Sequence, residues 1–506
     1  MTLAKSLLLS TAAGLIAVGG AQAADLPVKA KAVEYVKVCS LYGPGFYYIP
    51  GTDTCIKLGG YMRVDVLANT NNVATGNTSG LSGAQNRYTN GYTWRSRADV
   101  NIDTRTATEY GVVRTFFDAI YQWTSDGYTA NGNSSIYGAI PTPTGGAASG
   151  PLNAGQGNVL YGTVGVWYAF IQFAGFTMGK AVSQFSAPWT IYPGNTVDSL
   201  VGGGGGNTGV NQFTYTFDFG QGVTASLGVQ DQAAYTQAGI LNVAQGVGAA
   251  SFGASNYGGS MAPDIVGKIL VDQAWGLIQG SVAAHQNRSG YYGGLEGNGA
   301  PQDKWGYAAQ LAFSLKNLPT GPGDVINVQG VYTNGATRYN IQDLASPAGS
   351  AVMYSGISSV GLGMAPDSVY DGTVGGGGQQ HLVSTWGGRG AFTHNWDPYW
   401  STSLYGAYAA VSYGGGKDIV CAAYMKANAG VVKCNPDYNI GQLGLVTRWT
   451  PVKNLTFSAD VTYTMLNQNM VGTVNAGNAG IGKPPVDYVL KDQNSVTVLL
   501  RAQRNW

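Results

Sequence analysis

The chain has 506 residues with 27 basic and 26 acidic side chains, so its formal net charge of +1 identifies no partner. Charged residues make up 10% of the sequence, against about 25% in ordinary globular proteins, whereas Gly (77 residues) and Tyr (32 residues) are abundant. A mean hydropathy of -0.03 excludes a polytopic helical membrane protein. This composition favours one large β-barrel, with short turns, long loops and aromatic girdles, over two or three soluble domains.

The N-terminus has the features of a secretion signal, which predicts that residues 1–23 are removed on export. Lys5 supplies the positive end, LLLSTAAGLIAV the apolar core, and Ala21-Gln22-Ala23 a small-residue cleavage site. Residues 24–56 are then expected to form an N-terminal periplasmic segment, and residues 57–506 the barrel. Residues 344–366 lack charges but contain too many Gly, Ser and Pro for a membrane helix.

Four cysteines fall into two local pairs, Cys39 with Cys55 and Cys421 with Cys434. In the oxidising compartment that export implies, such pairs predict two disulfides that close small loops. Their separations are not metal-ligand spacings, and the sequence has only three histidines. No metal site and no cofactor are therefore expected.

Alternating apolar and polar residues, bounded by turn residues, predict sixteen transmembrane strands. The clearest case is 454–466, where Leu455, Phe457, Val461 and Tyr463 would face lipid while Thr456, Asp460 and Thr462 would face a water-filled lumen. The predicted strands are residues 57–67, 92–104, 109–121, 158–172, 175–184, 211–219, 222–231, 263–273, 275–287, 304–316, 324–333, 380–395, 399–413, 438–450, 454–466 and 493–505.

The connections alternate strictly between short turns and long loops, which favours an antiparallel outer-membrane barrel over the alternative of a secreted β-sandwich or propeller. Short turns would lie on the periplasmic side and long loops outside the cell. Most of the long loops are expected to be disordered, low-complexity surface segments. They are residues 68–91, 122–157, 185–210, 232–262, 288–303, 334–379, 414–437 and 467–492.

Charged side chains of the first three strands share the polar parity, and an arginine in lipid near the bilayer midplane would cost about 2–4 kcal/mol. They are therefore expected to line the lumen. Two alternatives remain open for these arginines: a basic patch that filters solutes by charge in a narrow pore, or wall structure neutralised by the aspartates. The set is Arg63, Asp65, Arg95, Arg97, Asp99, Arg114 and Asp118, with Arg448 and Arg501 extending it from the fourteenth and last strands.

The third long loop, at about 185–210, carries two aromatic side chains, Trp189 and Tyr192, and a single charge, Asp198. Its Gly run is no phosphate-binding loop, because neither a Gly-Lys-Ser/Thr sequence nor a following helix accompanies it. The sequence shows no Ser/His/Asp set, no paired carboxylates and no metal cluster, so catalysis is not expected.

Residues 38–61, VCSLYGPGFYYIPGTDTCIKLGGY, resemble the porins of alphaproteobacteria, of the rhizobial and brucella type. The RTATEYG turn at 105–111 and the closing strand that ends in Trp506 are further matching pieces. The resemblance implies a sixteen-stranded porin of the bacterial outer membrane that forms a homotrimer and folds its third loop into the lumen as a constriction. It also implies that the outer-membrane assembly machinery reads Trp506.

The expected function is a passive, water-filled channel for ions and small hydrophilic solutes. The alternative is a substrate-selective channel, for example for sugars, in which Trp189 and Tyr192 stack on the ligand. A barrel enzyme or adhesin is a third class, which lacks any catalytic constellation to support it. The expected partners are outer-membrane lipid and lipopolysaccharide, further copies of the chain and the assembly machinery, with no nucleic acid.

Overall fold

The computed structural model forms two compact units, Met1–Ile56 and Lys57–Trp506. Among the residues it describes, no helix is long and apolar enough to cross a membrane. The described residues are 37–70, 92–124, 158–159, 162–189, 194, 200–204, 209–232, 237–292, 296, 299–342, 352–373, 378–475 and 484–506. The predicted signal peptide therefore lies outside them and stays a prediction, as does the periplasmic assignment of residues 24–56.

The smaller unit is closed by the predicted Cys39–Cys55 disulfide, which is confirmed. A 3-10 helix, η1 (Ser40–Tyr42), follows the first cysteine, and β1 (Tyr47–Tyr48) pairs antiparallel with residues 55 and 56. Both cysteines are buried with Phe46 in a small apolar cluster. A segment this short holds its shape because the crosslink limits the unfolded chain.

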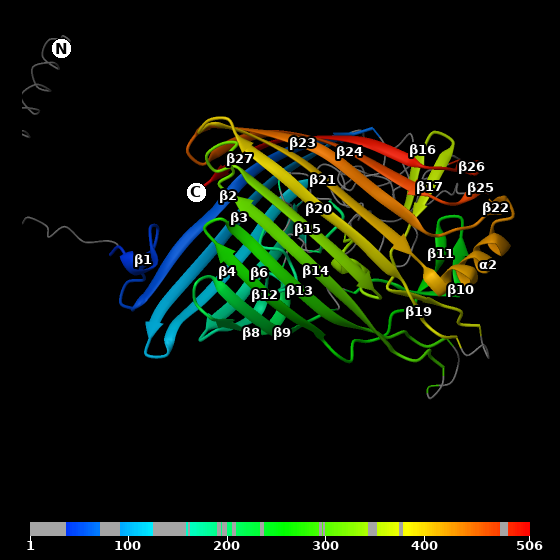
Figure 1. Ribbon diagram of the computed structural model, residues 1–506, viewed down its shortest axis with the longest axis horizontal. Coiled ribbons are helices and arrows are strands. Elements are labelled where there is room, and N and C mark those ends of the chain that lie inside the picture. The colour runs from blue at the N-terminus through cyan, green and yellow to red at the C-terminus, as the bar shows by residue number, and fades with distance from the viewer. Residues whose placement is uncertain are drawn as a thin grey trace, which may run out of the picture. The chain divides into compact units, whose positions relative to one another are not determined.

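The larger unit is a closed, antiparallel barrel of sixteen strands, as predicted (Figure 1). The ring closes because β2 pairs with the last strand, β27, as well as with β3. The strands are β2 (Thr54–Asn69), β3 (Tyr92–Thr108), β4 (Gly111–Thr124), β6 (Gly162–Phe173), β7 (Phe176–Ala181), β8 (Val210–Asp218), β9 (Val223–Gln230), β12 (Asp264–Gln273), β13 (Gly276–Asn287), β14 (Lys304–Lys316), β15 (Val325–Asn334), β20 (Ser384–Asn395), β21 (Trp400–Ser412), β23 (Tyr438–Val452), β24 (Leu455–Gln468) and β27 (Gln493–Asn505).

The two faces of the strands follow the predicted parity. On β24, Phe457, Val461 and Tyr463 are about two-fifths exposed on the outside, whereas Asp460 and Thr462 are buried on the inside. Aromatic side chains also gather on the outside towards both strand ends, as girdles at two membrane interfaces require. They include Trp305, Tyr307, Tyr332, Trp386 and Tyr408 towards the loop side, and Phe217, Trp275, Trp400 and Trp449 towards the turn side.

Four of the eight long loops, the fourth, sixth, seventh and eighth, form ordered elements in the part of the chain that the structure describes, so the prediction of disorder is wrong for these stretches. These loops form two further sheets, with strand orders β11-β10-β18-β19 and β16-β17-β26-β25-β22, and the helix α2 (Lys417–Ala427). The strands are β10 (Ile240–Gly248), β11 (Ser251–Ser255), β16 (Val352–Gly356), β17 (Ser359–Gly363), β18 (Ser368–Tyr370), β19 (His381–Leu382), β22 (Val431–Lys433), β25 (Val471–Asn475) and β26 (Asp487–Leu490). Among the described residues there are also three further short elements: β5 (Asn158–Val159), η3 (Thr337–Tyr339) and η4 (Gly414–Gly416).

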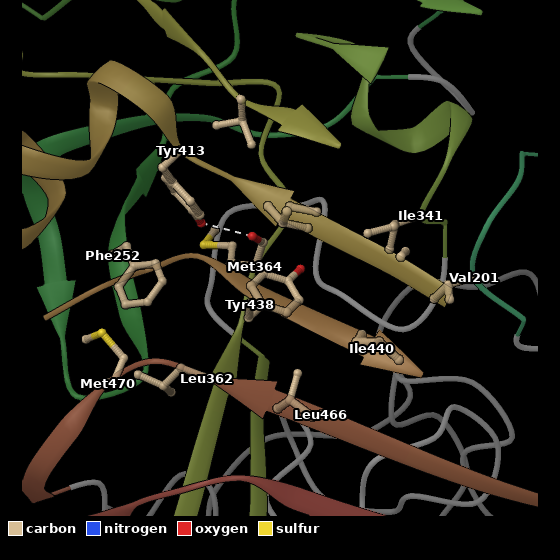
Figure 2. Packing of buried hydrophobic residues seen from close by; sticks show 14 of the residues in the cluster. Val201, Phe252, Ile341, Leu362, Met364, Tyr413, Tyr438, Ile440, Leu466 and Met470 are labelled. Atoms are coloured by element: carbon tan, nitrogen blue, oxygen red, sulfur yellow. Dashed lines mark hydrogen bonds between the residues drawn. The ribbon is translucent and has the colours of Figure 1, made fainter. Parts of the chain in front are cut away.

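These loop elements, here called the loop cap, share one apolar core with the inner face of β21, β23 and β24 (Figure 2). Phe252 of the fourth loop, Met364 of the sixth and Met470 of the eighth are buried there with Tyr413, whose hydroxyl donates to the carbonyl oxygen of Met364 at 2.9 Å. Burial among these side chains raises the pKa of the Tyr413 phenol well above its usual range. The predicted Cys421–Cys434 disulfide, which is confirmed, ties α2 to β22.

Candidate pore and its constriction

The third loop follows β7, and its described residues (182–189, 194, 200–204 and 209) lie against the inner face of the barrel, as predicted. Phe185 is fully buried against Val266 of β12 and Tyr339 of the sixth loop, with the two aromatic ring centroids 4.6 Å apart. Gln279 of β13 donates to the Ser186 carbonyl at 2.8 Å, and Gln310 of β14 donates to the Phe185 carbonyl at 2.8 Å. The barrel wall thus holds the start of the loop through its backbone carbonyl oxygens. These two hydrogen bonds do not depend on which side chains occupy positions 185 and 186.

The middle of the third loop is held by strands further around the ring. The Trp189 indole N–H donates to Gln329 of β15 at 2.8 Å. Arg389 of β20 donates to the carbonyl oxygens of Leu200 and Gly204, at 3.3 and 3.2 Å. Arg448 of β23 donates to the carbonyl of Gly194 and, at 2.8 Å, to the Ser403 hydroxyl. Arg389 and Arg448 therefore help to hold the loop by charge-assisted hydrogen bonds to its backbone.

The glycine run of the third loop has a packing role. Gly202 adopts a φ of +83°, and a Cβ there would lie 2.2 Å from the carbonyl oxygen of Gly388 on β20. The N–H groups of Gly202 and Gly203 both donate to the Asn340 carbonyl, at 3.1 and 3.0 Å. Only glycine permits this backbone to lie flat on another backbone, so the run fixes the loop against the wall.

The charged side chains of β27, β2, β3 and β4 gather on one sector of the inner face, here called the arginine wall: Arg63, Arg95, Arg97, Arg105, Arg114 and Arg501, with Asp65, Asp99, Asp103 and Asp118. Asp65 is fully buried between two of the arginines. Its carboxylate lies 2.5 Å from Arg95 Nη2 and 2.7 Å from Arg501 Nε. A buried carboxylate flanked by two guanidinium groups is held ionised, because each supplies an opposite charge and a hydrogen bond.

Arg97 and Arg63 each contact neutral amide and aromatic side chains. Arg97 donates to the Gln122 side chain at 2.9 and 2.7 Å, and its guanidinium lies 5.0 Å from the Trp167 ring centroid. Arg63 donates to Gln503 at 2.8 Å and stacks on a tyrosine ring of its own strand. Both arginines keep their positive charge while amide and aromatic groups fix their position.

Towards the periplasmic turns, Asp103 forms ion pairs with Arg105 and Arg114, each with a nitrogen to oxygen distance of 3.0 Å. Arg114 also lies 5.2 and 5.5 Å from the ring centroids of Phe116 and Phe170. Asp99 accepts an N–H of Asn101 at 3.3 Å, and Asn101 pairs in register with Asp118. The wall as a whole has six arginines for four aspartates.

The other candidate residues do not lie in one cluster. Arg501 joins the arginine wall through Asp65, whereas Arg448 lies on β23, two strands from β27, and contacts the third loop instead. Tyr192 and Asp198 lie outside the described residues. Arg389 was not singled out from the sequence, although a charged residue within a predicted strand was a usable signal, since lipid excludes it.

A second cluster that sequence reasoning missed joins the barrel to the sixth loop. His285 of β13 lies between two buried carboxylates, with Nδ1 at 2.8 Å from Asp264 and Nε2 at 3.4 Å from Asp367. The Tyr339 hydroxyl donates to Asp264 at 2.6 Å, and the Thr337 N–H donates to Asp367 at 2.6 Å. These residues are far apart in sequence and carry no shared motif, so only the fold brings them together.

A closed barrel with an inward third loop and a charged inner wall has the geometry of a channel. The family model described as "Porin subfamily" matches residues 25–499 of the chain. The chain belongs to the porin family. This porin is 31% identical to Porin Omp2b of Brucella suis biovar 1 (strain 1330) over 318 residues, which cover 62% of the chain and 75% of that protein. Porin Omp2b of Brucella melitensis biotype 1 matches with the same identity and coverage.

Among solved structures, the porin is similar to the outer membrane channel DcaP of Acinetobacter baumannii, with a TM-score of 0.55 and 13% sequence identity. The alignment covers 91% of this chain and 99% of that chain, which supports the shared barrel fold. Family, relatives and fold together place the porin in the bacterial outer membrane, where it forms a general porin channel.

Proposed function

We propose that solutes cross this porin through the space between the third loop and the arginine wall, where charge and width together decide passage. The observation that carries the proposal is the position of the third loop. Its described residues between 185 and 204 contact β12, β13, β14, β15, β20 and β23, and its two ends contact β6, β8 and β9, all outside the sector that carries the arginine wall. The loop and the wall would then be the two sides of the constriction.

The candidate pore-lining set is the one predicted from the sequence, with two changes of role. Arg63 and Arg114 would present charge to solutes, while Arg95, Arg97, Asp65 and Arg501 would act mainly as a buried framework, since Arg95, Arg97 and Asp65 are only 2%, 4% and 0% exposed. Arg448 would position the third loop. Asp99 and Asp118 would moderate the positive field of the wall.

Replacing Arg95 and Arg97 together with Ser should shift the channel towards cations, because two guanidinium groups leave the wall while Asp65 and Asp99 stay. Charges at a constriction act on a passing ion within the roughly 8 Å screening length of physiological salt. The reversal potential in a KCl gradient across a planar bilayer measures this. Arg288→Ser, at a half-exposed ion pair with Asp303 beyond the strand β13, is the matched control. An unchanged potential and conductance in the double variant would show that these arginines are neutral wall structure.

No observation favours the sugar-selective alternative as a second function. Its aromatic residues were Trp189, whose indole N–H is bound to Gln329, and Tyr192, which lies outside the described residues. Block of the single-channel current by a particular sugar would support that alternative against general diffusion.

The mature porin would begin at Ala24, use Trp506 as the signal for outer-membrane assembly, contact lipid and lipopolysaccharide, and form a homotrimer. The trimer would pack mainly through the first third of the barrel. The apolar outer residues Met62 and Val64 of β2 and Phe117 of β4 suit either lipid or a neighbouring subunit, because both are apolar surroundings.

A further inference from the structure

The inner wall around the anchor of the third loop carries mainly uncharged polar side chains. Facing inwards on β8, β9, β13 and β14 are hydroxyl and amide side chains: Thr214, Thr216, Ser226, Gln279, Ser281, Gln310 and Ser314. One basic side chain stands among them, Lys268 of β12. From β3 of the arginine wall, β12 is the sixth strand along the ring, by way of β4, β6, β7, β8 and β9.

Strand register places Lys268 on the inside. It pairs directly with Ser226 of β9 and Ser281 of β13, and directly paired residues of antiparallel strands lie on the same face. Both serines are buried on the inner wall, whereas the next residue along β12, Ile269, is 61% exposed on the outer face.

Lys268 lies just beyond the anchor of the third loop. The preceding inward position of β12 is Val266, which packs against Phe185 of the loop. Because β12 runs from a long loop to a short turn, Lys268 is one inward step closer to the periplasm than this contact. Its charge therefore belongs to the periplasmic edge of the constriction that the loop makes.

Lys268 also differs from the arginines in its partners. Within the described part of the chain it makes neither an ion pair nor a hydrogen bond. The two aspartates at the ends of its own strand are engaged elsewhere: Asp264 with His285 and Tyr339, and Asp272 with Lys316 at 2.6 Å. The described residues of the third loop carry no charged side chain.

We infer that Lys268 is a specificity-determining residue, which forms with the hydroxyls of Ser226 and Ser281 a subsite for small hydrophilic anions. The arginine wall has an excess of two arginines over aspartates, and Lys268 adds an uncompensated positive charge on the other side of the opening. Solutes then meet positive charge from two sides of the opening. Carboxylate and phosphate oxygens suit this site, because an ammonium group and serine hydroxyls donate hydrogen bonds to them. The inference rests on the proposed function as a diffusion channel.

Lys268→Gln and Lys268→Glu test the inference in planar bilayers under a KCl gradient. A unit charge about 4 Å from an ion in water changes relative permeability by roughly fivefold, so the chloride to potassium permeability ratio should fall by about that factor in Lys268→Gln and further in Lys268→Glu. Lys268→Arg should keep the ratio. Inorganic phosphate should reduce the chloride current of the unmodified porin more than that of Lys268→Gln.

Lys316→Gln is the matched control, since this lysine is paired with Asp272 at the periplasmic end of the same region and is 39% exposed. Its permeability ratio should stay at the unmodified value. An unchanged ratio in both Lys268→Gln and Lys268→Glu would overturn the inference while the channel function stands. A purified porin that conducts no current at all would instead refute the proposed function.

Discussion

Asp324 shows how one side chain can join two periplasmic turns. It lies directly before β15 with no exposed surface, and its carboxylate accepts from Thr320 at 2.6 Å, His394 at 2.7 Å and the Asn395 N–H at 2.8 Å. Burial alone would raise the pKa of Asp324, but these hydrogen bonds and the His394 charge lower it to about 2. The ionised carboxylate is thus part of the folded structure at the turn end of β14, β15 and β20.

The lowered pKa of Asp324 has a defined consequence for acid stability. Because the folded-state value lies below the unfolded value of about 3.9, the carboxylate contributes stability that is fully present above that pH and is lost as the pH falls through about 2. Asp324→Asn should remove this part of the pH dependence. Unfolding midpoints in denaturant, measured between pH 2 and pH 6, check it. Parallel curves for the variant and the unmodified porin would contradict the assignment.

Gly202 allows the third loop to pack closely against β20. Gly202→Ala would place a Cβ 2.2 Å from the Gly388 carbonyl and push the loop off β20 into the lumen. We expect a lower mean conductance and more open-channel noise, because the displaced loop occupies the remaining opening. Single-channel recording measures both.

Gly220→Ala is the control for backbone strain alone. Gly220 has a similar φ of +78°, but nothing lies within 4 Å of a Cβ at that turn. Left-handed backbone costs roughly 1–2 kcal/mol for an alanine, so both variants carry the strain and only Gly202→Ala carries the clash. Equal conductance and noise in the two variants would mean that the packing of Gly202 does not position the loop.

The transmembrane strands could be predicted from the sequence because the residues of each strand alternate between an apolar and a polar face. Lipid outside and water inside impose a period of two on every strand, so β24 could be assigned from thirteen consecutive letters. The same reasoning located Asp65, Arg95 and Arg97 on the inside. It could not assign their partners, since the Arg501–Asp65 pair forms only when the last strand closes on the first.

The loop cap could not be predicted in this way, because its core is assembled from side chains of several loops that are distant in sequence. Each segment is too short to show a convincing period. One local signal was present on β21, where Tyr405, Ala407, Ala409 and Val411 face inwards. Such an apolar inner face is unsuited to water, so it indicates that protein, rather than solvent, fills that side of the lumen.

The proposed homotrimer is a property of the whole molecule. A homotrimer predicts a species of three chains in mild detergent, which converts to single chains only on heating or in strong denaturant. Light scattering coupled to size-exclusion chromatography measures the mass, with a heated sample as the control. Recovery of the single-chain mass without heating would contradict the trimer.

The loop cap also limits how the exposed surface of this porin can vary over evolution. Phages and antibodies select for change in extracellular loops, and loops that fold independently can change one at a time. Here Phe252, Met364, Tyr424 and Met470, from four different loops, pack in one core, so a change of size in one loop requires an answering change in another. Escape variants should therefore accumulate at exposed cap positions such as Val432 and Val471, whose side chains are 77% and 50% exposed and lie outside this core.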